Sequence, residues 1–461
     1  MTDIAPLTLT ARFDRDTIGR SRPSPRHLVI QVQAPDVTAP ARDAVPPLNL
    51  ALVIDASGSM SADDGAAGPN GVPLTRLAAA RQAAAGIARC LRERDALSVV
   101  SFADDTQTHV EARSMDAAGQ REACAAIAAI DPRGSTNLHD GWLRGAELAA
   151  SHMEKDGTCQ NRVLVLSDGH ANQGVTDPGA LAEIAAGLRQ RGLFTSCVGI
   201  GLDYSTDQLE QMAEHGGGLL HHAERPAEII EIVLAELRQM RAIVADDVSV
   251  EVDLPPGQLP DGRGYPLRVQ VLGLTADIED NTLRAPLGAL TSGASRHLVL
   301  QLRTRRHCDR DTLHLPVRLS WRDRDGQRHT AAAGTRLTRV SPDQARATPF
   351  DTGIGELAAR AWLATIVRTA VDLNRGGDGR RAQTWVRAQE KEFGAYCRHL
   401  PAGDEHLRRL RHLTAAIVRP PHERSRRGIS MFHYRSLKGT QDLRAAAPAD
   451  WEGSLESERP A

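Results

Sequence analysis

Five side chains in this sequence have oxygen atoms that could together bind a metal ion. Each of them follows an apolar run or lies in a short polar loop: Asp55, Ser57, Ser59, Thr136 and Asp168. Carboxylates and hydroxyls are hard ligands, which suit Mg²⁺ before Ca²⁺ or Mn²⁺ and leave room for water or an open position. The sequence therefore predicts a divalent-metal site whose ligands are oxygen atoms from separate loops.

The alternating spacing of the first ligands has a structural requirement. Asp55, Ser57 and Ser59 can face one point only if the loop that contains them curls into the start of a helix. Gly58 lies between the serines and helps the backbone to turn. The N-terminus of that helix would then lie near the ligands.

The elements that must hold these loops lie within residues 46–243. Continuous apolar runs at 48–54, 96–102 and 162–166 have the pattern of strands buried on both faces of a sheet. Further strands are predicted at 106–111, at 193–200 and near Leu219, and helices at 74–92, 117–130, 137–155, 179–191, 205–214 and 226–243. This alternation predicts an α/β fold with a doubly wound, mostly parallel sheet, in which ligands bind at the carboxyl ends of the strands.

The regions on both sides of this α/β segment have a different pattern. Residues 246–340 alternate apolar and polar positions between turn signals, as antiparallel strands do, and residues 8–34 look alike. We expect the two regions to join into one β-sandwich, with the α/β domain inserted between them. Helical periodicity returns over 353–418. The predicted organisation is N-terminal β-strands (1–45), the α/β domain (46–243), an antiparallel β domain (244–345), a helical region (350–420) and a basic, then acidic, partly disordered tail (421–461).

The order of these motifs is similar to that of a known family. The Asp-x-Ser-x-Ser pattern at 55–59, Thr136 after Gly-Ser, and the Asp168-Gly169 pair resemble the metal-ion-dependent adhesion site of von Willebrand factor A domains. The resemblance covers residues 46–243. The wider layout resembles bacterial proteins of this family that also have a β domain and a helical tail. Some relatives resemble animal inter-α-inhibitor heavy chains and calcium-activated chloride channel regulators, but the regions outside residues 46–243 match only loosely and indicate no mechanism.

The resemblance implies a role for each residue of the site. Ser57, Ser59 and Thr136 would bind the ion directly. Asp55 and Asp168 would bind it directly or through water. An exposed Asp or Glu of a partner protein would complete the coordination. The face offered to that partner would include the following neighbours of the ligands: Gly58, Asn137, Gly169, His139 and His170.

The function implied by the resemblance is that of a metal-dependent protein-binding module rather than an enzyme. Such a module would act in the assembly or regulation of a bacterial complex, in some relatives beside an ATPase of the AAA class. The sequence alone names neither the partner nor the oligomeric state.

Two alternative functions remain open from the residues alone. In the first, His139 or His170 acts as a general base beside a metal-bound water, which makes the protein a metal-dependent hydrolase. No set of nucleophile, base and orienting group is visible in the sequence to support it. In the second, the metal site is inactive and the domain is structural, so that Asp55→Ala leaves partner binding unchanged. A closed pocket lined by the histidines would favour the hydrolase, and a broad exposed surface would favour the binding module.

Other polar segments have simpler interpretations. Residues 61–73 form a Gly- and Pro-rich insert beside the site, which we interpret as a solvated loop. His221 and His222 could bind a transition metal, but a strand-end pair on a solvated turn is the favoured interpretation. The glycines at 216–218 are not a phosphate-binding loop, because no Gly-x-x-x-x-Gly-Lys-Ser/Thr pattern exists, and ATP binding is not predicted.

Bulk composition narrows the classes of partner. The formal net charge of −2 over 461 residues gives no overall attraction to nucleic acid or to acidic membranes. Residues 424–438 interleave basic and aromatic side chains, which raises the hypothesis of a second partner site, but a solvated tail is favoured.

The cysteines form no CxxC pair, which argues against a structural zinc site or a disulfide scaffold. No signal peptide and no apolar run of ~18–20 residues is visible, so we expect a cytoplasmic protein without a membrane span.

Overall fold

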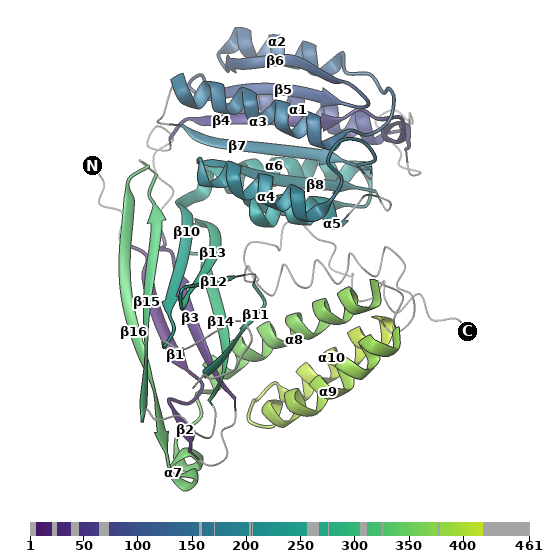
Figure 1. Ribbon diagram of the computed structural model, residues 1–461. Helices are drawn as coiled ribbons and strands as arrows, with labels where there is room; N and C mark the ends of the chain where they lie inside the picture. The colour runs from purple at the N-terminus through teal and green to yellow at the C-terminus, as the bar shows by residue number, and fades with distance from the viewer. Residues whose placement is uncertain are drawn as a thin grey trace.

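The chain forms an α/β domain, a β-sandwich and a helical region, which Figure 1 shows at the top, at the lower left and at the lower right. The computed structural model describes residues 6–20, 25–37, 46–63, 73–155, 159–169, 171–201, 204, 206–255, 267–274, 276–304, 311–324, 326–375 and 379–417. The basic segment at 424–438 and the acidic tail therefore lie outside the described residues.

The sheet of the α/β domain has the spatial order β6-β5-β4-β7-β8-β9. Its strands are β4 (Leu48–Asp55), β5 (Ala96–Phe102), β6 (Thr106–Ser114), β7 (Gln160–Ser167), β8 (Leu193–Ile200) and β9 (Gly217–Ala223). All neighbours pair in parallel except β6, which is the antiparallel edge strand. Every residue of β4, β5, β7 and β8 is buried, which is why these strands read as continuous apolar runs. The predicted doubly wound, mostly parallel sheet is confirmed.

Helices cover both faces of this sheet. They are α1 (Arg76–Cys90), α2 (Ala117–Ala128), α3 (Leu138–Lys155), α4 (Pro178–Gln190), α5 (Thr206–His215) and α6 (Pro226–Ala242). Alternate residues of β4 divide between the two layers, because successive side chains of a strand point to opposite faces. Leu50, Leu52 and Ile54 pack with α1 and α6, whereas Ala51 and Val53 pack with α3 on the other face.

The α3 helix approaches the sheet closely because glycine replaces a larger residue at its contact positions. A Cβ atom built on Gly145 would lie 2.4 Å from Cγ2 of Val53, and one built on Gly141 would lie 2.5 Å from Cβ of Phe102. Real Cβ atoms do not approach other atoms so closely, and both neighbours are fully buried. Any side chain at Gly145 would therefore push α3 away from β4.

We expect Gly145→Ala to lower the free energy of unfolding by about 1–3 kcal/mol, because overpacking outweighs the gain in helix propensity. The matched control is Gly187→Ala in α4, where a built Cβ meets no atom within 4 Å. That change should raise the free energy of unfolding by roughly 0.5–1 kcal/mol. Urea unfolding followed by circular dichroism measures both, and equal effects of the two substitutions would contradict the packing argument.

The strands on either side of the α/β domain form one sandwich of two sheets. The first sheet has the order β1-β3-β14-β11, with bounds Thr8–Phe13, Arg26–Gln33, Ser295–Thr304 and Leu267–Leu272. The second has the order β12-β13-β10-β15-β16-β2, with bounds Asp277–Glu279, Thr282–Thr291, Ile243–Asp253, Thr312–Arg322, Arg328–Val340 and Thr17–Gly19. Strand β3 pairs antiparallel with β14, and β2 pairs with β16. The N-terminal strands thus complete the sandwich, which confirms the expected insertion of the α/β domain.

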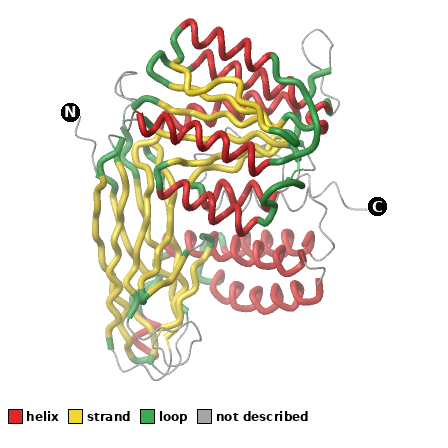
Figure 2. Tube along the Cα trace, turned by 45° about the horizontal axis from the view of Figure 1, so that its top comes forward, coloured by secondary structure: helices red, strands yellow, loops and turns green. Residues whose placement is uncertain are grey.

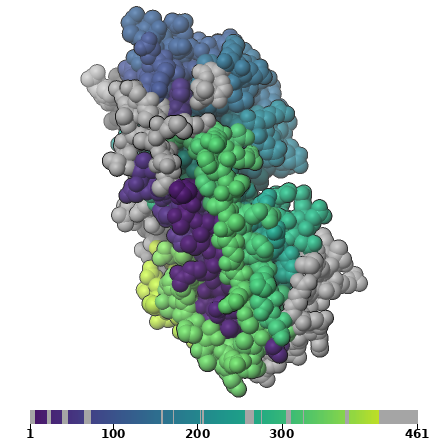
Figure 3. Space-filling view, turned by 90° about the vertical axis from the view of Figure 1, so that its left-hand side faces the viewer, coloured from purple at the N-terminus to yellow at the C-terminus, as the bar shows by residue number. Residues whose placement is uncertain are grey.

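The helical region covers the outer face of the first sheet of the sandwich. It consists of α7 (Pro342–Ala347), α8 (Thr352–Arg375), α9 (Gly379–Cys397) and α10 (Gly403–Ile417). Residues of β3, β11 and β14 that point away from the second sheet join the core of α8: Val29, Leu272 and Val299 with Trp362 and Leu363. Figure 2 shows α8, α9 and α10 on one side of the strands. Figure 3 shows the opposite side of the molecule, where the N-terminal strands lie along residues near 340. None of the described helices combines the length and apolarity needed to cross a membrane.

Both connections between the α/β domain and the sandwich lie at the amino edge of the parallel sheet. The chain enters at Pro46, just before β4, and leaves where α6 ends and β10 begins at Ile243. The carboxyl ends of the strands lie at the opposite edge. The predicted metal ligands follow β4 and β7 and therefore lie away from the two connections.

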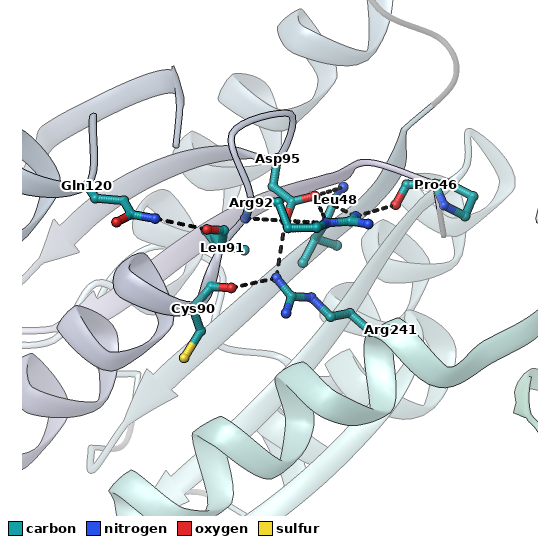
Figure 4. A network of polar contacts seen from close by, with 8 residues as sticks. All are labelled: Pro46, Leu48, Cys90, Leu91, Arg92, Asp95, Gln120 and Arg241. Atoms are coloured by element: carbon teal, nitrogen blue, oxygen red, sulfur yellow. Dashed lines mark hydrogen bonds and ion pairs between the residues drawn. The ribbon is translucent and has the colours of Figure 1, made fainter. Parts of the chain in front are cut away.

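A buried carboxylate joins these connections, and nothing in the sequence indicated its contacts. Asp95 is fully buried, and its oxygens accept hydrogen bonds from the backbone N–H groups of Leu48 and Arg92. The guanidinium of Arg92 donates to Asp95 at 2.7 Å and to the carbonyl of Pro46 at 2.8 Å. Arg241, near the end of α6, donates to Asp95 at 3.2 Å. Figure 4 shows the two guanidinium groups converging on this one carboxylate.

Candidate metal centre

Three loops meet at the carboxyl edge of the parallel sheet, and backbone hydrogen bonds hold them together. After β4 the chain turns into a short 3-10 helix (Gly58–Ser61). The N–H of Gly58 donates to the carbonyl of Gly134, which lies in the loop before α3. Thr136 in that loop exchanges hydrogen bonds with Asn172, which lies in the loop after β7. The predicted curl after Asp55 is therefore present, and it is a 3-10 rather than an α-helical turn.

Hydroxyl and carboxylate oxygens form a chain across these loops. Oγ of Ser57 lies 3.0 Å from Oγ of Ser59, and Oγ of Ser59 donates to Oδ1 of Asp168 at 2.7 Å. Thr136 lies beside Gly169, the residue that follows Asp168, because a Cβ atom built on Gly169 would be 3.0 Å from Oγ1 of Thr136. The structure thus brings oxygens of the predicted ligands together, and this donor set fits a hard divalent cation.

Asp55 has a different environment from the other candidate ligands. It is fully buried; its Oδ1 accepts from the backbone N–H of Ser57 at 2.8 Å, and its Oδ2 accepts from Oγ of Ser167 at 2.6 Å. Burial raises the pKa of Asp55 to about 6, and the nearby charge of Asp168 adds to the rise, while the hydrogen bonds oppose it. Because both carboxylate oxygens already accept hydrogen bonds, Asp55 orients the serine loop. Sequence reasoning missed Ser167, whose only signal is its position at the end of β7.

A buried arginine also reaches the site, and sequence reasoning missed it. Arg76 begins α1, and its NH1 atom donates to Oδ2 of Asp168 at 2.8 Å. The side chain of Arg76 is 9% exposed, and that of Asp168 is fully buried. Gly201 makes room for the guanidinium, because a Cβ built there would lie 2.6 Å from its central carbon. One oxygen of Asp168 therefore faces the hydroxyl chain, and the other faces a fixed positive charge.

The rim of the site is exposed. Gly58 and Ser59 are exposed on one side, and the loop from Asn172 to Gly174 is exposed on the other. Asn137, predicted to contact a partner, is buried and holds the first turn of α3 by donating to Asp140 at 2.7 Å.

The described residues give little support to the hypothesis that His139 or His170 acts as a general base. Nδ1 of His139 lies 2.8 Å from Oδ1 of Asp140, on the first turn of α3. His170 lies outside the described residues, as does most of the predicted solvated insert, residues 64–72. The hydrolase alternative stays a prediction.

The interpretation of His221 as part of a solvated turn is wrong. Strand β9 continues to Ala223, so His221 lies inside the sheet, where it is 1% exposed. Its Nε2 lies 2.7 Å from Oε2 of Glu236, and Oε1 of Glu236 accepts from Ser196 at 2.6 Å. Within the described part of the chain, no group of three or more His, Cys, Asp or Glu side chains could hold a metal ion. His221 is therefore a hydrogen-bonded core residue.

Comparison with known proteins agrees with this geometry. Residues 49–233 match the family model of the von Willebrand factor type A domain. The chain is 27% identical over 259 residues to the uncharacterized protein YfbK of Escherichia coli K12, an alignment that covers 56% of this chain and 42% of YfbK. It is 27% identical over 177 residues to human inter-alpha-trypsin inhibitor heavy chain H4, covering 38% of this chain and 18% of that protein. The chain thus spans less than half the length of these curated relatives.

The fold as a whole is similar to a solved structure. The von Willebrand factor type A protein of Catenulispora acidiphila superposes with a TM-score of 0.66 at 16% identity, covering 97% of this chain and 99% of that one. At this identity the likeness shows the fold alone. It extends over the sandwich and the helical region as well as the α/β domain.

Proposed function

Because residues 49–233 form a von Willebrand factor type A domain, a family that commonly mediates metal-dependent protein interaction, we propose that this chain captures an acidic group of a partner protein at a Mg²⁺ site. The residues that would hold the ion are Ser57, Ser59, Thr136 and Asp168, with Asp55 orienting the serine loop. When bound, the ion supplies a Lewis-acidic position for a carboxylate oxygen of the partner. The observation that carries the proposal is the continuous chain of oxygens from Ser57 through Ser59 to Asp168.

The exposure of the site supports a protein partner rather than a small enclosed substrate. Ser59, the middle member of the oxygen chain, and the adjacent Gly58 are exposed, and so is the loop over 172–174. A side chain that projects from another protein could reach such a position. Assembly or regulation of a bacterial complex in the cytoplasm, with an AAA-class ATPase as one candidate partner, is part of this proposal.

Metal binding is tested first with the purified chain. We expect Ser57→Ala to weaken binding of Mn²⁺ or Mg²⁺ at least tenfold in calorimetry, because a 1.4 kcal/mol loss is tenfold in affinity and a direct ligand is removed. The matched control is Ser61→Ala, an exposed serine in the same short helix. Equal affinities of Ser57→Ala and the unmodified protein would overturn the assignment of Ser57 as a ligand.

Partner capture is tested in an extract of the native host. The protein is immobilised and washed either with Mg²⁺ or with EDTA, and retained proteins are compared with those on the Ser57→Ala and Ser61→Ala variants. Partners that are lost both with EDTA and with Ser57→Ala support the proposal. Partners that persist in both conditions would contradict it and would favour a structural domain.

A further inference from the structure

A cavity with a volume of ≈ 330 Å³ lies where the sandwich meets the helical region. This volume is within the range of small-molecule sites, which begin at about 300 Å³. Its lining combines cationic and aromatic side chains from separate parts of the chain: Arg15, Arg26, Arg303, Phe350, Trp362 and Tyr396. None of these residues belongs to the metal centre.

The polar floor of the cavity is a fixed hydrogen-bond network. Oδ1 of Asp14 accepts from the backbone N–H groups of Arg15 and His27, at 2.8 and 3.1 Å. Oδ2 of Asp14 lies 2.8 Å from Nδ1 of His27 and accepts from the hydroxyl of Tyr396 at 3.0 Å. Gln301 holds the other side of the His27 ring at 3.1 Å. Because both oxygens of Asp14 have these partners, the floor of the cavity is preorganised.

The walls have an excess of positive charge. The three arginines that line the cavity exceed its two carboxylates, Asp14 and Glu392, by one formal charge. Arg303 and Glu392 pair with each other at 2.5 Å. Arg15 is different, because its Nε is buried and has no hydrogen-bond partner among the described residues. The pKa of His399, which also lines the cavity, is lowered by burial and then by the charge of Arg15.

Aromatic side chains form the apolar part of the walls. The Arg15 guanidinium lies 5.5 Å from the ring centre of Phe350, and Phe350 packs edge-on against Tyr396 at 5.7 Å. Trp362 packs against Tyr396 at 5.8 Å. A flat apolar body would find aromatic surface here, while an attached negative charge would find an arginine donor without an acceptor.

We propose that this cavity binds a small organic anion, an aromatic or similarly flat monocarboxylate. Arg15 receives the carboxylate, Arg26 contributes positive charge, and the rings of Phe350, Trp362 and Tyr396 hold the apolar body. The site joins the sandwich to α8 and α9, and its ligand would bind independently of the metal centre.

The test uses naphthalene-2-carboxylate as the probe and naphthalene-2-carboxamide as its neutral match, with the full chain in EDTA. Calorimetry or ligand-observed NMR should show one site for the carboxylate and at least tenfold weaker binding of the amide. Arg15→Gln should weaken carboxylate binding at least tenfold. The control is Arg12→Gln, which removes an exposed arginine of β1. Arg12 pairs with Asp351, and its replacement should leave carboxylate binding unchanged.

A second variant blocks the cavity without removing charge. Ala395 is exposed on α9 and lines the cavity, so Ala395→Trp should fill it and abolish carboxylate binding while circular dichroism stays unchanged. Absence of binding by the unmodified protein would overturn the proposal. Equal binding of carboxylate and amide, or unchanged binding by both Arg15→Gln and Ala395→Trp, would overturn it too.

Discussion

An Asp95→Ala variant is expected to lose about 3–5 kcal/mol of unfolding free energy, because removal of one partner leaves buried charges without compensation. Asp95 is fully buried and accepts from two backbone N–H groups as well as from Arg92 and Arg241. Its loss would loosen the connection before β4 and the end of α6 together. Urea unfolding followed by circular dichroism measures the effect.

The matched control is Asp131→Ala. Asp131 pairs with Arg81 at 3.8 Å, but its side chain is 87% exposed, so we expect a loss of less than about 1 kcal/mol. A similar loss in both variants would show that the buried network has no special role.

The same network predicts a dependence on pH. Burial raises the pKa of Asp95, but the hydrogen bonds and charge of Arg92 and the backbone donors outweigh it, so the pKa is lowered overall. A depressed pKa in the folded state stabilises the protein above the unfolded-state pKa of about 4, and this contribution is lost as the pH falls through the folded-state pKa. The difference in stability between the unmodified protein and Asp95→Ala should therefore shrink below about pH 4.

The α/β domain and the sandwich could be predicted because their patterns are local. Strands buried on both faces are continuous apolar runs, and the half-buried strand β15 alternates along its length. Strands β2 and β12 and helix α7 were not predicted, because three or six residues are too few for a period to appear. The Ser341-Pro342 start of α7, with a capping box to Gln344, was the available signal.

The candidate site could be predicted only in part. Asp55, Ser57 and Ser59 form one motif, and their convergence with Asp168 follows from parallel strands that end at one edge. Arg76 could not be assigned, because it lies 92 residues from Asp168 and its place depends on how α1 packs. Arg241 and Asp95 are 146 residues apart for the same reason. Such contacts depend on tertiary packing and have no period or spacing in the sequence.

Replacing Arg76 with glutamine is expected to tighten binding of Mg²⁺ or Mn²⁺ at least tenfold, a change opposite in sign to that of Ser57→Ala. Arg76 places a buried positive charge 2.8 Å from Oδ2 of Asp168, at the site where a cation would bind. Even with an effective dielectric constant of 20, two unit charges ~4 Å apart interact by about 4 kcal/mol. Tenfold in affinity requires only about 1.4 kcal/mol of that repulsion.

Two controls separate charge from packing. Arg76→Lys keeps the positive charge, so its affinity for the metal should not rise above that of the unmodified protein. Arg81→Gln lies on the same helix, where Arg81 donates to the carbonyl of Ile130, and should leave metal affinity unchanged. In EDTA, Arg76→Gln should unfold at a lower temperature, because Asp168 loses its ion pair, and added Mg²⁺ should restore stability. Unchanged or weaker Mn²⁺ binding by Arg76→Gln would contradict the argument.

The formal charges at the metal site predict that Arg76 also affects partner binding. The carboxylates of Asp55 and Asp168, when ionised, cancel the charge of a divalent ion, so the bound site without Arg76 would be neutral. With Arg76 it has a formal charge of +1, which favours the approach of a partner carboxylate. We therefore expect Arg76→Gln to bind the metal more tightly yet to retain less partner in the Mg²⁺ pull-down. An increase in both would show that the arginine only competes with the ion and does not attract the partner.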